Sequence, residues 1–289
     1  MSTAQPHTST TPTDMGTAAA EQVIAEAVEA AEAVLGPEIE AMFALGSVAH
    51  GGFAPLVSDV DVAIVLSYTT PGTAARIARV QSVVVEEARS PLAERLSLFW
   101  ADWEAVRTGR GEHNRLGPID RLDLLDSGQL LLGTDRREGS VRPSHEELVL
   151  MSADHMLKKF TPDYLDRLRD TRALLDGGPR AVTKAILFPV RFMYTLKSGG
   201  VGFNDNAARW YAVEELPGSA LALAALRWRG EGIVCEDRAA QMLDADLATI
   251  HAECLGQYAA QLEGLGETRR AAALRERVAC VHLAAPEPL

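Results

Sequence analysis

Two aspartates separated by a single residue are the feature of this sequence best suited to chemistry. Asp59 and Asp61 flank Val60 at the start of an apolar run that continues to Leu66. Such a run predicts a buried strand, and alternate residues of a strand point to the same face. Two carboxylates on one face repel each other unless a cation lies between them, and a hard divalent cation binds oxygen ligands of this kind. The spacing therefore predicts a metal site at the start of the strand.

A glycine–serine pair precedes the two aspartates in the chain. Gly46 and Ser47 follow directly after the apolar run of residues 42–45. At the end of a strand and before a short helix, the backbone N–H groups and the hydroxyl of such a pair can bind a phosphate. A phosphate-binding turn beside metal-binding carboxylates indicates nucleotide chemistry.

The elements that position these residues are predicted to alternate between helix and strand. Apolar residues at helical spacing predict helices, and short apolar runs predict strands. The expected helices cover residues 17–35 and 73–90, and the expected strands cover residues 42–45, 60–66 and 96–100. This order predicts a small α/β unit over residues 17–140, in which residues 118–132 add a helix or a helix followed by a strand.

The rest of the chain, residues 141–289, is predicted to form an all-helical second domain. Apolar residues recur there at helical spacing, and glycines and prolines divide the segments. The expected helices cover residues 144–160, 162–176, 180–198, 205–215, 218–229, 236–263 and 266–283. Residues 1–16 are rich in threonine, serine and proline, which predicts a disordered tail.

Composition and charge narrow the class of protein. The chain has 289 residues, of which 47% are hydrophobic and 24% charged, and no apolar run approaches the ~18–20 residues that span a bilayer. Since no such run is present, we expect no membrane partner. Its three cysteines fit neither a zinc site nor a disulfide framework, so we expect a cytoplasmic protein. The net charge is −12, and residues 1–140 carry 20 acidic and 10 basic side chains. This charge predicts no polynucleotide partner and favours a small cationic or metal-chelated ligand.

The stretch from Leu45 to Ala63 resembles the signature of the DNA-polymerase-β-like nucleotidyltransferase superfamily. Within that superfamily, the chain is most similar to the aminoglycoside adenylyltransferases that modify streptomycin and spectinomycin. Further similar segments extend the resemblance over roughly residues 40–230; they are residues 118–133, 191–195, 204–210 and 216–217. The resemblance implies an α+β fold, with an N-terminal nucleotidyltransferase domain of mixed sheet and flanking helices followed by an all-α helical bundle.

The resemblance also implies an activity associated with antibiotic resistance. This activity is the Mg²⁺-dependent transfer of a nucleotidyl group, AMP in this family, from ATP or another nucleoside triphosphate to a hydroxyl of a small cationic acceptor such as an aminoglycoside. By this resemblance, Asp59 and Asp61 hold two Mg²⁺ ions, Gly46 and Ser47 bind the β- and γ-phosphates, and Arg191 supplies a cation to the triphosphate.

The sequence departs from the family pattern at its third carboxylate. Ser97 occupies the position on the next strand where the family has an acidic residue that completes the metal site or acts as the base. We take Glu94 as the catalytic replacement; Asp102, or no replacement at all, are the alternatives.

Two further departures fall in the helical half. Asn204 stands where the family has a lysine, so Lys197 is our candidate for the missing nucleotide-binding charge, with Lys184 as the alternative. The family's acidic residue that grips the acceptor falls on Ala181.

These departures leave two other functions open. One is a nucleotide-binding protein with weakened or no catalysis, and the other is a protein-modifying nucleotidyltransferase of the antitoxin type. The oligomeric state is not fixed by the sequence.

Overall fold

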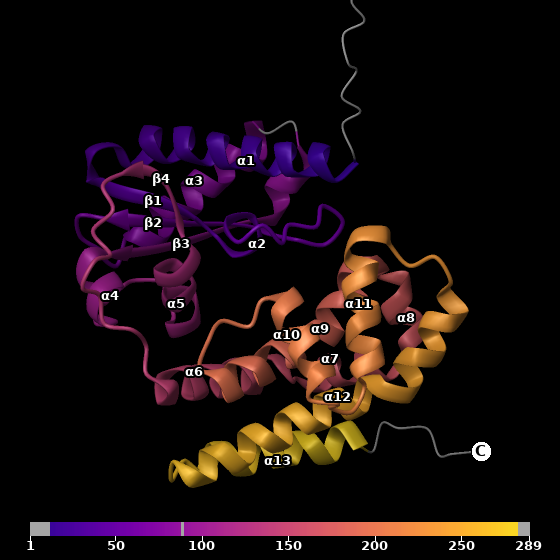
Figure 1. Cartoon of the computed structure of the whole chain (residues 1–289). Coiled ribbons are helices and arrows are strands. Elements are labelled where there is room, and N and C mark those ends of the chain that lie inside the picture. The colour runs from indigo at the N-terminus through magenta and orange to yellow at the C-terminus, as the bar shows by residue number, and fades with distance from the viewer. Residues whose placement is uncertain (1–11, 88–89, 283–289) are drawn as a thin grey trace, which may run out of the picture.

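A computed structural model describes residues 12–87 and 90–282, which form a sheet domain followed by a helical domain (Figure 1). Within these residues, the sheet has the strand order β3-β2-β1-β4. Strands β2 and β3 are parallel, and the other neighbouring pairs are antiparallel. The strands are β1 (Ile39–Leu45), β2 (Val60–Leu66), β3 (Leu96–Asp102) and β4 (Gln129–Gly133). The expected mixed sheet with flanking helices is therefore confirmed, and residues 118–132 resolve into a helix followed by a strand.

Side-chain alternation along the strands gives the sheet two apolar faces. One face packs on α1 (Pro12–Leu35) and α3 (Thr73–Glu87), and it includes Met42, Ala44, Val60, Val62 and Ile64. The opposite face packs on α4 (Trp103–Thr108) and α5 (Pro118–Ser127), and it includes Ala41, Phe43, Leu45, Ala63 and Val65. Residues two apart on a strand share a face, so Asp61 lies on the face of Ala63 and Val65, away from α1. Helix α1 begins at Pro12, before the expected start at Thr17, and residues 1–11 of the expected tail lie outside the described residues.

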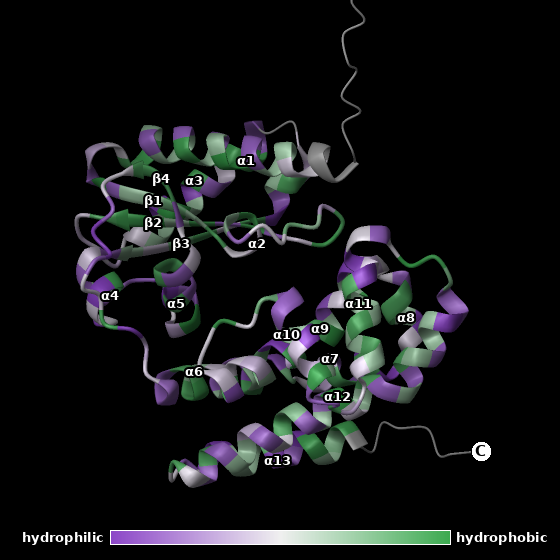
Figure 2. Cartoon of the chain, in the orientation of Figure 1, coloured by the Kyte–Doolittle hydropathy of each residue, from purple (hydrophilic) through white to green (hydrophobic). Residues whose placement is uncertain are grey.

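The strands and the covering helices differ in their hydropathy patterns. In Figure 2 the strands contain continuous hydrophobic stretches, whereas α1 alternates between hydrophilic and hydrophobic bands. This difference is expected because the sheet is covered on both faces, whereas a surface helix buries only one side. Three short helical turns connect the larger elements; they are η1 (Gly36–Glu38), α2 (Gly46–Ala49) and η2 (Pro91–Arg95).

The second domain is helical throughout its described residues, as expected. Its helices are α6 (His145–Lys159), α7 (Pro162–Arg169), α8 (Thr171–Asp176), α9 (Gly178–Ser198), α10 (Asn204–Val213), α11 (Ser219–Glu231), α12 (Glu236–Gly264) and α13 (Thr268–His282). The single helix expected over residues 162–176 is divided into two, because Asp170 ends α7 and its side chain caps α8 by accepting from the Ala173 N–H. Among the helices of residues 12–87 and 90–282, none combines the length and the hydrophobicity needed to cross a membrane.

Helix α9 is at the centre of the helical core and carries an internal proline, Pro189. A proline has no N–H, so the carbonyl four residues earlier, that of Ala185, loses its helical hydrogen-bond donor. His251 of α12 replaces this donor, because its Nε2 lies 2.9 Å from the Ala185 oxygen. A carbonyl only accepts, so Nε2 carries the proton, and the buried Nδ1 has no partner among the described residues. Burial lowers the pKa of His251 to about 4.

The two domains meet at a small apolar cluster below α5. Leu122 of α5 packs with Leu148 of α6 and with Val201, which follows α9. Close to this cluster, the buried Arg121 donates to the Val141 carbonyl at 2.6 Å and so ties α5 to the segment that leads into the helical domain. The cluster fixes α5 and α9 on either side of a cavity.

Candidate functional site

A cavity of about 290 Å³ lies between the two domains, and opposite charges line its two sides. Its lining carboxylates all come from the sheet domain, and we call them the acidic wall: Asp59, Asp61, Asp120 and Asp123. Its lining lysines and arginines all come from the helical domain, and we call them the basic wall: Lys159, Lys184, Arg191 and Arg229. Of the site residues expected from the sequence, the cavity is lined by Gly46, Ser47, Asp59, Asp61 and Arg191.

The turn after β1 packs directly against one of the aspartates. Gly46 has a φ of +60°, and a Cβ at this position would lie 2.6 Å from Oδ2 of Asp61, so both the backbone and the neighbour require glycine. The Gly46 N–H donates to Oδ2 of Asp123 at 2.8 Å. Ser47 follows at the cavity surface. The Gly46 N–H is thus already bonded within the protein, and the turn links the aspartates of β2 and α5.

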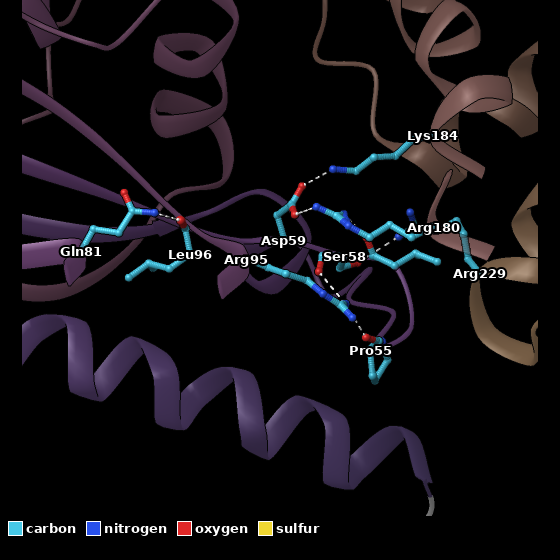
Figure 3. A network of polar contacts seen from close by, with 10 residues as sticks. Pro55, Ser58, Asp59, Gln81, Arg95, Leu96, Arg180, Lys184 and Arg229 are labelled. Carbon is cyan, nitrogen blue, oxygen red and sulfur yellow. Dashed lines mark hydrogen bonds and ion pairs between the residues drawn. The ribbon is translucent and has the colours of Figure 1, made fainter. Parts of the chain in front are cut away.

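Asp59 directly precedes β2 and Asp61 is the second residue of β2, and the two carboxylates differ in their partners. Asp59 accepts from Nη2 of Arg180 at 2.6 Å and from Nζ of Lys184 at 2.7 Å (Figure 3). Both cations come from α9, so this aspartate joins the two domains. Desolvation, together with the charge of Asp59, raises the pKa of Asp61 to about 7. Asp61 is therefore a carboxylate that lacks sufficient positive charge nearby.

Helix α5 contributes two carboxylates that the sequence analysis did not select. Asp120 lies in the first turn of α5, and burial next to Asp123 raises its pKa to about 6. Asp123 lies one helical turn later on the same face and also accepts from the Ser127 hydroxyl. The available signal was the Asp-x-x-Asp spacing within the segment from Ile119 to Leu124, whose other residues are mainly apolar, which puts two charges beside a buried surface.

The expected position of the third carboxylate is occupied by a serine in the structure. Ser97 of β3 pairs in register with Asp61 of β2. Glu94, which we expected to replace it, is exposed in η2 and does not line the cavity. Asp102, the alternative, caps α4 at the far end of β3, where it accepts from the Ala105 N–H at 2.8 Å. Neither Glu94 nor Asp102 lines the cavity, because the Glu94 side chain is exposed and the Asp102 side chain caps α4, whereas Asp120 lines the cavity from α5.

The two arginines of the basic wall, Arg191 and Arg229, are held by backbone carbonyls. Arg191 donates to the Gly202 carbonyl at 2.6 Å. Its side chain is exposed in the cavity, but protein surrounds the guanidinium group on the other sides, and this desolvation lowers its pKa. Arg229 donates to the Gly52 carbonyl at 3.2 Å, and burial lowers its pKa to about 10. The charges of both arginines also act to lower the pKa of His50 in the turn after β1, where burial is the main cause of the shift.

Lys197, the residue expected to supply the missing charge, does not line the cavity, whereas the alternative Lys184 does. Lys184 lies seven residues before Arg191, which places both on one side of α9. Lys197 lies six residues after Arg191, which turns it by about 240° around the helix axis. It donates to Gln257 at 2.8 Å on the outside of the helical domain.

The carboxylate oxygens of the acidic wall could bind Mg²⁺ if phosphate oxygens and water supplied the remaining ligands. No cluster of three or more His, Cys, Asp or Glu side chains in the described chain is arranged to hold a metal ion by itself. Mg²⁺ commonly binds one or two carboxylates and takes its other ligands from water and substrate phosphates. Asp59 and Asp61 supply two such carboxylates, and the raised pKa of Asp61 indicates that a cation would stabilise its ionised form.

Comparison with known proteins relates this chain to solved structures rather than to a sequence family. No family model and no curated protein sequence matches this chain. Among solved structures, the fold is similar to that of the spectinomycin adenyltransferase AAD(9) from Enterococcus faecialis, crystallised with ATP and spectinomycin. The match has 14% sequence identity and a TM-score of 0.52, and it covers 77% of this chain and 98% of the other. At this level of identity, the similarity shows a shared fold and nothing more.

Proposed function

We propose that this protein transfers a nucleotidyl group from a nucleoside triphosphate to a hydroxyl of a small molecule. The observation that carries the proposal is the division of one cavity into an acidic and a basic wall, each supplied by a different domain. A metal–triphosphate complex requires carboxylates that can hold a divalent cation and, on the opposite side, cations that can bind the phosphate oxygens. The donor is taken to be ATP, because the structurally similar adenyltransferase was crystallised with ATP.

In this proposal, the triphosphate lies between the two walls. Asp59 and Asp61 hold Mg²⁺, which neutralises the charge of the phosphate oxygens when it is bound. Ser47 and Arg191 line the cavity on its opposite sides and bind phosphate oxygens through a hydroxyl and a guanidinium group. Arg180 and Lys184 must then release Asp59, since a carboxylate oxygen that binds the metal is no longer free for the ion pair.

Asp120 is the proposed general base. The hydroxyl oxygen of the acceptor forms a bond to the α-phosphorus, its proton passes to the Asp120 carboxylate, and pyrophosphate leaves with the electron pair of the broken bond. A base works best when its pKa is close to but below the operating pH, and burial raises the pKa of Asp120 to about 6. Asp120 thereby takes the role that Ser97 cannot perform, because a serine hydroxyl is not a base at neutral pH.

The test measures pyrophosphate release from ATP and Mg²⁺ in the presence of a panel of hydroxyl-bearing acceptors. We expect Asp120→Asn to lower kcat by about 100-fold or more, which is the usual contribution of a general base, with little change in the KM for ATP. Glu94→Gln is the matched control, because Glu94 is exposed and lies outside the cavity. If Glu94→Gln abolished turnover while Asp120→Asn retained it, the assignment of the base would be refuted.

A nucleotide-binding protein without turnover is a second candidate, favoured by Ser97 beside Asp61. It predicts the same Mg²⁺-dependent binding of ATP but no pyrophosphate release with any acceptor. Calorimetry and the release assay on one preparation separate the two functions. Binding without release supports the second candidate, and Asp120-dependent release supports transfer.

A further inference from the structure

Both oxygens of the Asp59 carboxylate are occupied by cations of the helical domain. Oδ1 accepts from Nη2 of Arg180 at 2.6 Å, and Oδ2 accepts from Nζ of Lys184 at 2.7 Å (Figure 3). The two cations are one helical turn apart near the start of α9, so they lie on one side of the helix. A metal ion that binds Asp59 must therefore displace at least one of them.

These two ion pairs can break without separation of the domains, because the segment before Asp59 has other contacts with the helical domain. Nη1 of Arg180 donates to the Val57 carbonyl at 3.0 Å. Nη2 of Arg229 donates to the Ser58 hydroxyl oxygen at 3.2 Å. Arg180 is therefore held close to Asp59 whether or not the two side chains are paired.

The charges around Asp59 are unfavourable for a free divalent cation. Asp59 contributes one negative charge and its partners contribute two positive charges, so free Mg²⁺ meets a net positive group there. In the described chain, neither Arg180 nor Lys184 pairs with a second carboxylate, so free Mg²⁺ would leave the displaced cations without a partner. The complex of Mg²⁺ with a triphosphate is an anion, and its phosphate oxygens can pair with the cations that Asp59 releases.

We propose that Arg180 and Lys184 are internal counter-ions that close Asp59 to free Mg²⁺ and open it to Mg²⁺ in complex with a polyphosphate. In the loaded site, Asp59 binds the metal and the two cations pair with phosphate oxygens, so each charged group exchanges one partner for another. The inference rests on the proposed function and goes beyond it, because it assigns to two residues the selection of the metal–nucleotide complex over the free metal.

The experiment compares the binding of Mn²⁺ alone with the binding of Mn²⁺ in complex with α,β-methylene-ATP, whose methylene bridge cannot be cleaved. Mn²⁺ prefers the same oxygen ligands as Mg²⁺. The electron paramagnetic resonance signal of aqueous Mn²⁺ decreases when the ion binds to protein, and binding of the complex is measured by calorimetry. We expect the wild type to bind the complex at least about tenfold more tightly than Mn²⁺ alone, because the phosphates form charged hydrogen bonds with the two cations.

Two variants with the same chemical change separate the effect of the ion pair from the effect of the cavity charge. We expect Lys184→Gln to strengthen the binding of Mn²⁺ alone by about three- to fivefold, as is typical for the loss of a partly exposed ion pair. Lys159→Gln is the matched control: it also removes a lysine charge from the cavity lining, but Nζ of Lys159 lies against the rings of Tyr164 and Phe188. The control should change the binding of Mn²⁺ alone less than Lys184→Gln does.

The double variant Arg180→Gln with Lys184→Gln tests the exchange of partners. It should strengthen the binding of Mn²⁺ alone by about tenfold or more, because both oxygens of Asp59 become free. The ratio of the affinity for the complex to the affinity for Mn²⁺ alone should fall by about tenfold or more, because the phosphates lose the two cations. Adding Asp59→Asn to the double variant should abolish the gain in the binding of Mn²⁺ alone.

The outcomes separate this inference from the function on which it rests. Failure of the wild type to bind the Mn²⁺–α,β-methylene-ATP complex refutes the proposed function, and the inference falls with it. If the complex binds but Lys184→Gln strengthens the binding of Mn²⁺ alone no more than Lys159→Gln does, the inference alone is overturned. An unchanged affinity ratio in the double variant also overturns it, because the two cations then obstruct free and complexed metal alike.

Discussion

Replacing His251 with glutamine should remove a loss of stability that occurs in mild acid. His251 is buried, donates to the Ala185 carbonyl through Nε2, and has a pKa of about 4 instead of the ordinary 6.5. The folded protein therefore binds fewer protons than the unfolded chain between these two pH values. Stability is fully present above about pH 6.5 and is lost as the pH falls towards about 4. The difference between the two pKa values corresponds to about 3 kcal/mol in total, of which about 2 kcal/mol is lost between about pH 7.5 and pH 5.

The assay is urea unfolding followed by circular dichroism at several pH values across this range. Glutamine retains an N–H donor for the Ala185 carbonyl but does not titrate, so His251→Gln should lose about 2 kcal/mol less than the wild type between about pH 7.5 and pH 5. The comparison cancels the contribution of other titrating groups because they are common to both proteins. Parallel pH dependence of the two proteins would refute the reasoning.

The hydrogen bond between His251 and the Ala185 carbonyl also leads to a prediction about Pro189. His251→Leu leaves the Ala185 carbonyl without a donor and should lower the free energy of unfolding by about 1–3 kcal/mol. Pro189→Ala restores an N–H four residues after Ala185, so the loss caused by His251→Leu should shrink by about 1 kcal/mol in the Pro189→Ala background. Strict additivity of the two substitutions would show that the histidine does not replace the missing helical donor.

Three further predictions concern the cavity. The affinity for Mg²⁺–ATP should rise as the pH increases to about 7, because Asp61 must release a proton to bind the metal. Below pH 7 the rise should be up to about tenfold per pH unit, and calorimetry should show that it vanishes in Asp61→Asn. Gly46→Ala should abolish Mg²⁺–ATP binding, whereas Gly51→Ala, which also has a positive φ but open space around it, should cause only a modest loss of thermal stability. Arg191→Gln should weaken ATP binding by about tenfold or more, whereas Lys197→Gln, on the outer side of the same helix, should leave the dissociation constant unchanged.

The sequence could predict those site residues that come from segments close together in the chain. Gly46, Ser47, Asp59 and Asp61 belong to two consecutive strands and their connection, so strand alternation alone brings them together. The helical second domain was likewise predictable, because apolar periodicity reports burial within each element, whereas the mixed sheet was expected only from the family resemblance.

The residues that were missed depend on contacts between distant segments. Asp120 and Arg229 reach the cavity only because α5 and α11 pack around it, and no local pattern reports that packing. Two expected residues were misplaced for local geometric reasons. Glu94 precedes β3 in an exposed turn, and Lys197 points away from the cavity because six residues do not complete a whole number of helical turns.

Binding of Mg²⁺–α,β-methylene-ATP to the wild type and to Asp59→Asn tests the central claim most directly. The account predicts that the wild type binds the analogue and that added Mg²⁺ increases the affinity. In Asp59→Asn the increase caused by Mg²⁺ should be lost, because a metal-binding carboxylate has been removed. An equal effect of Mg²⁺ in both proteins, or no binding by the wild type, would contradict the assignment of this cavity to a metal–nucleotide complex.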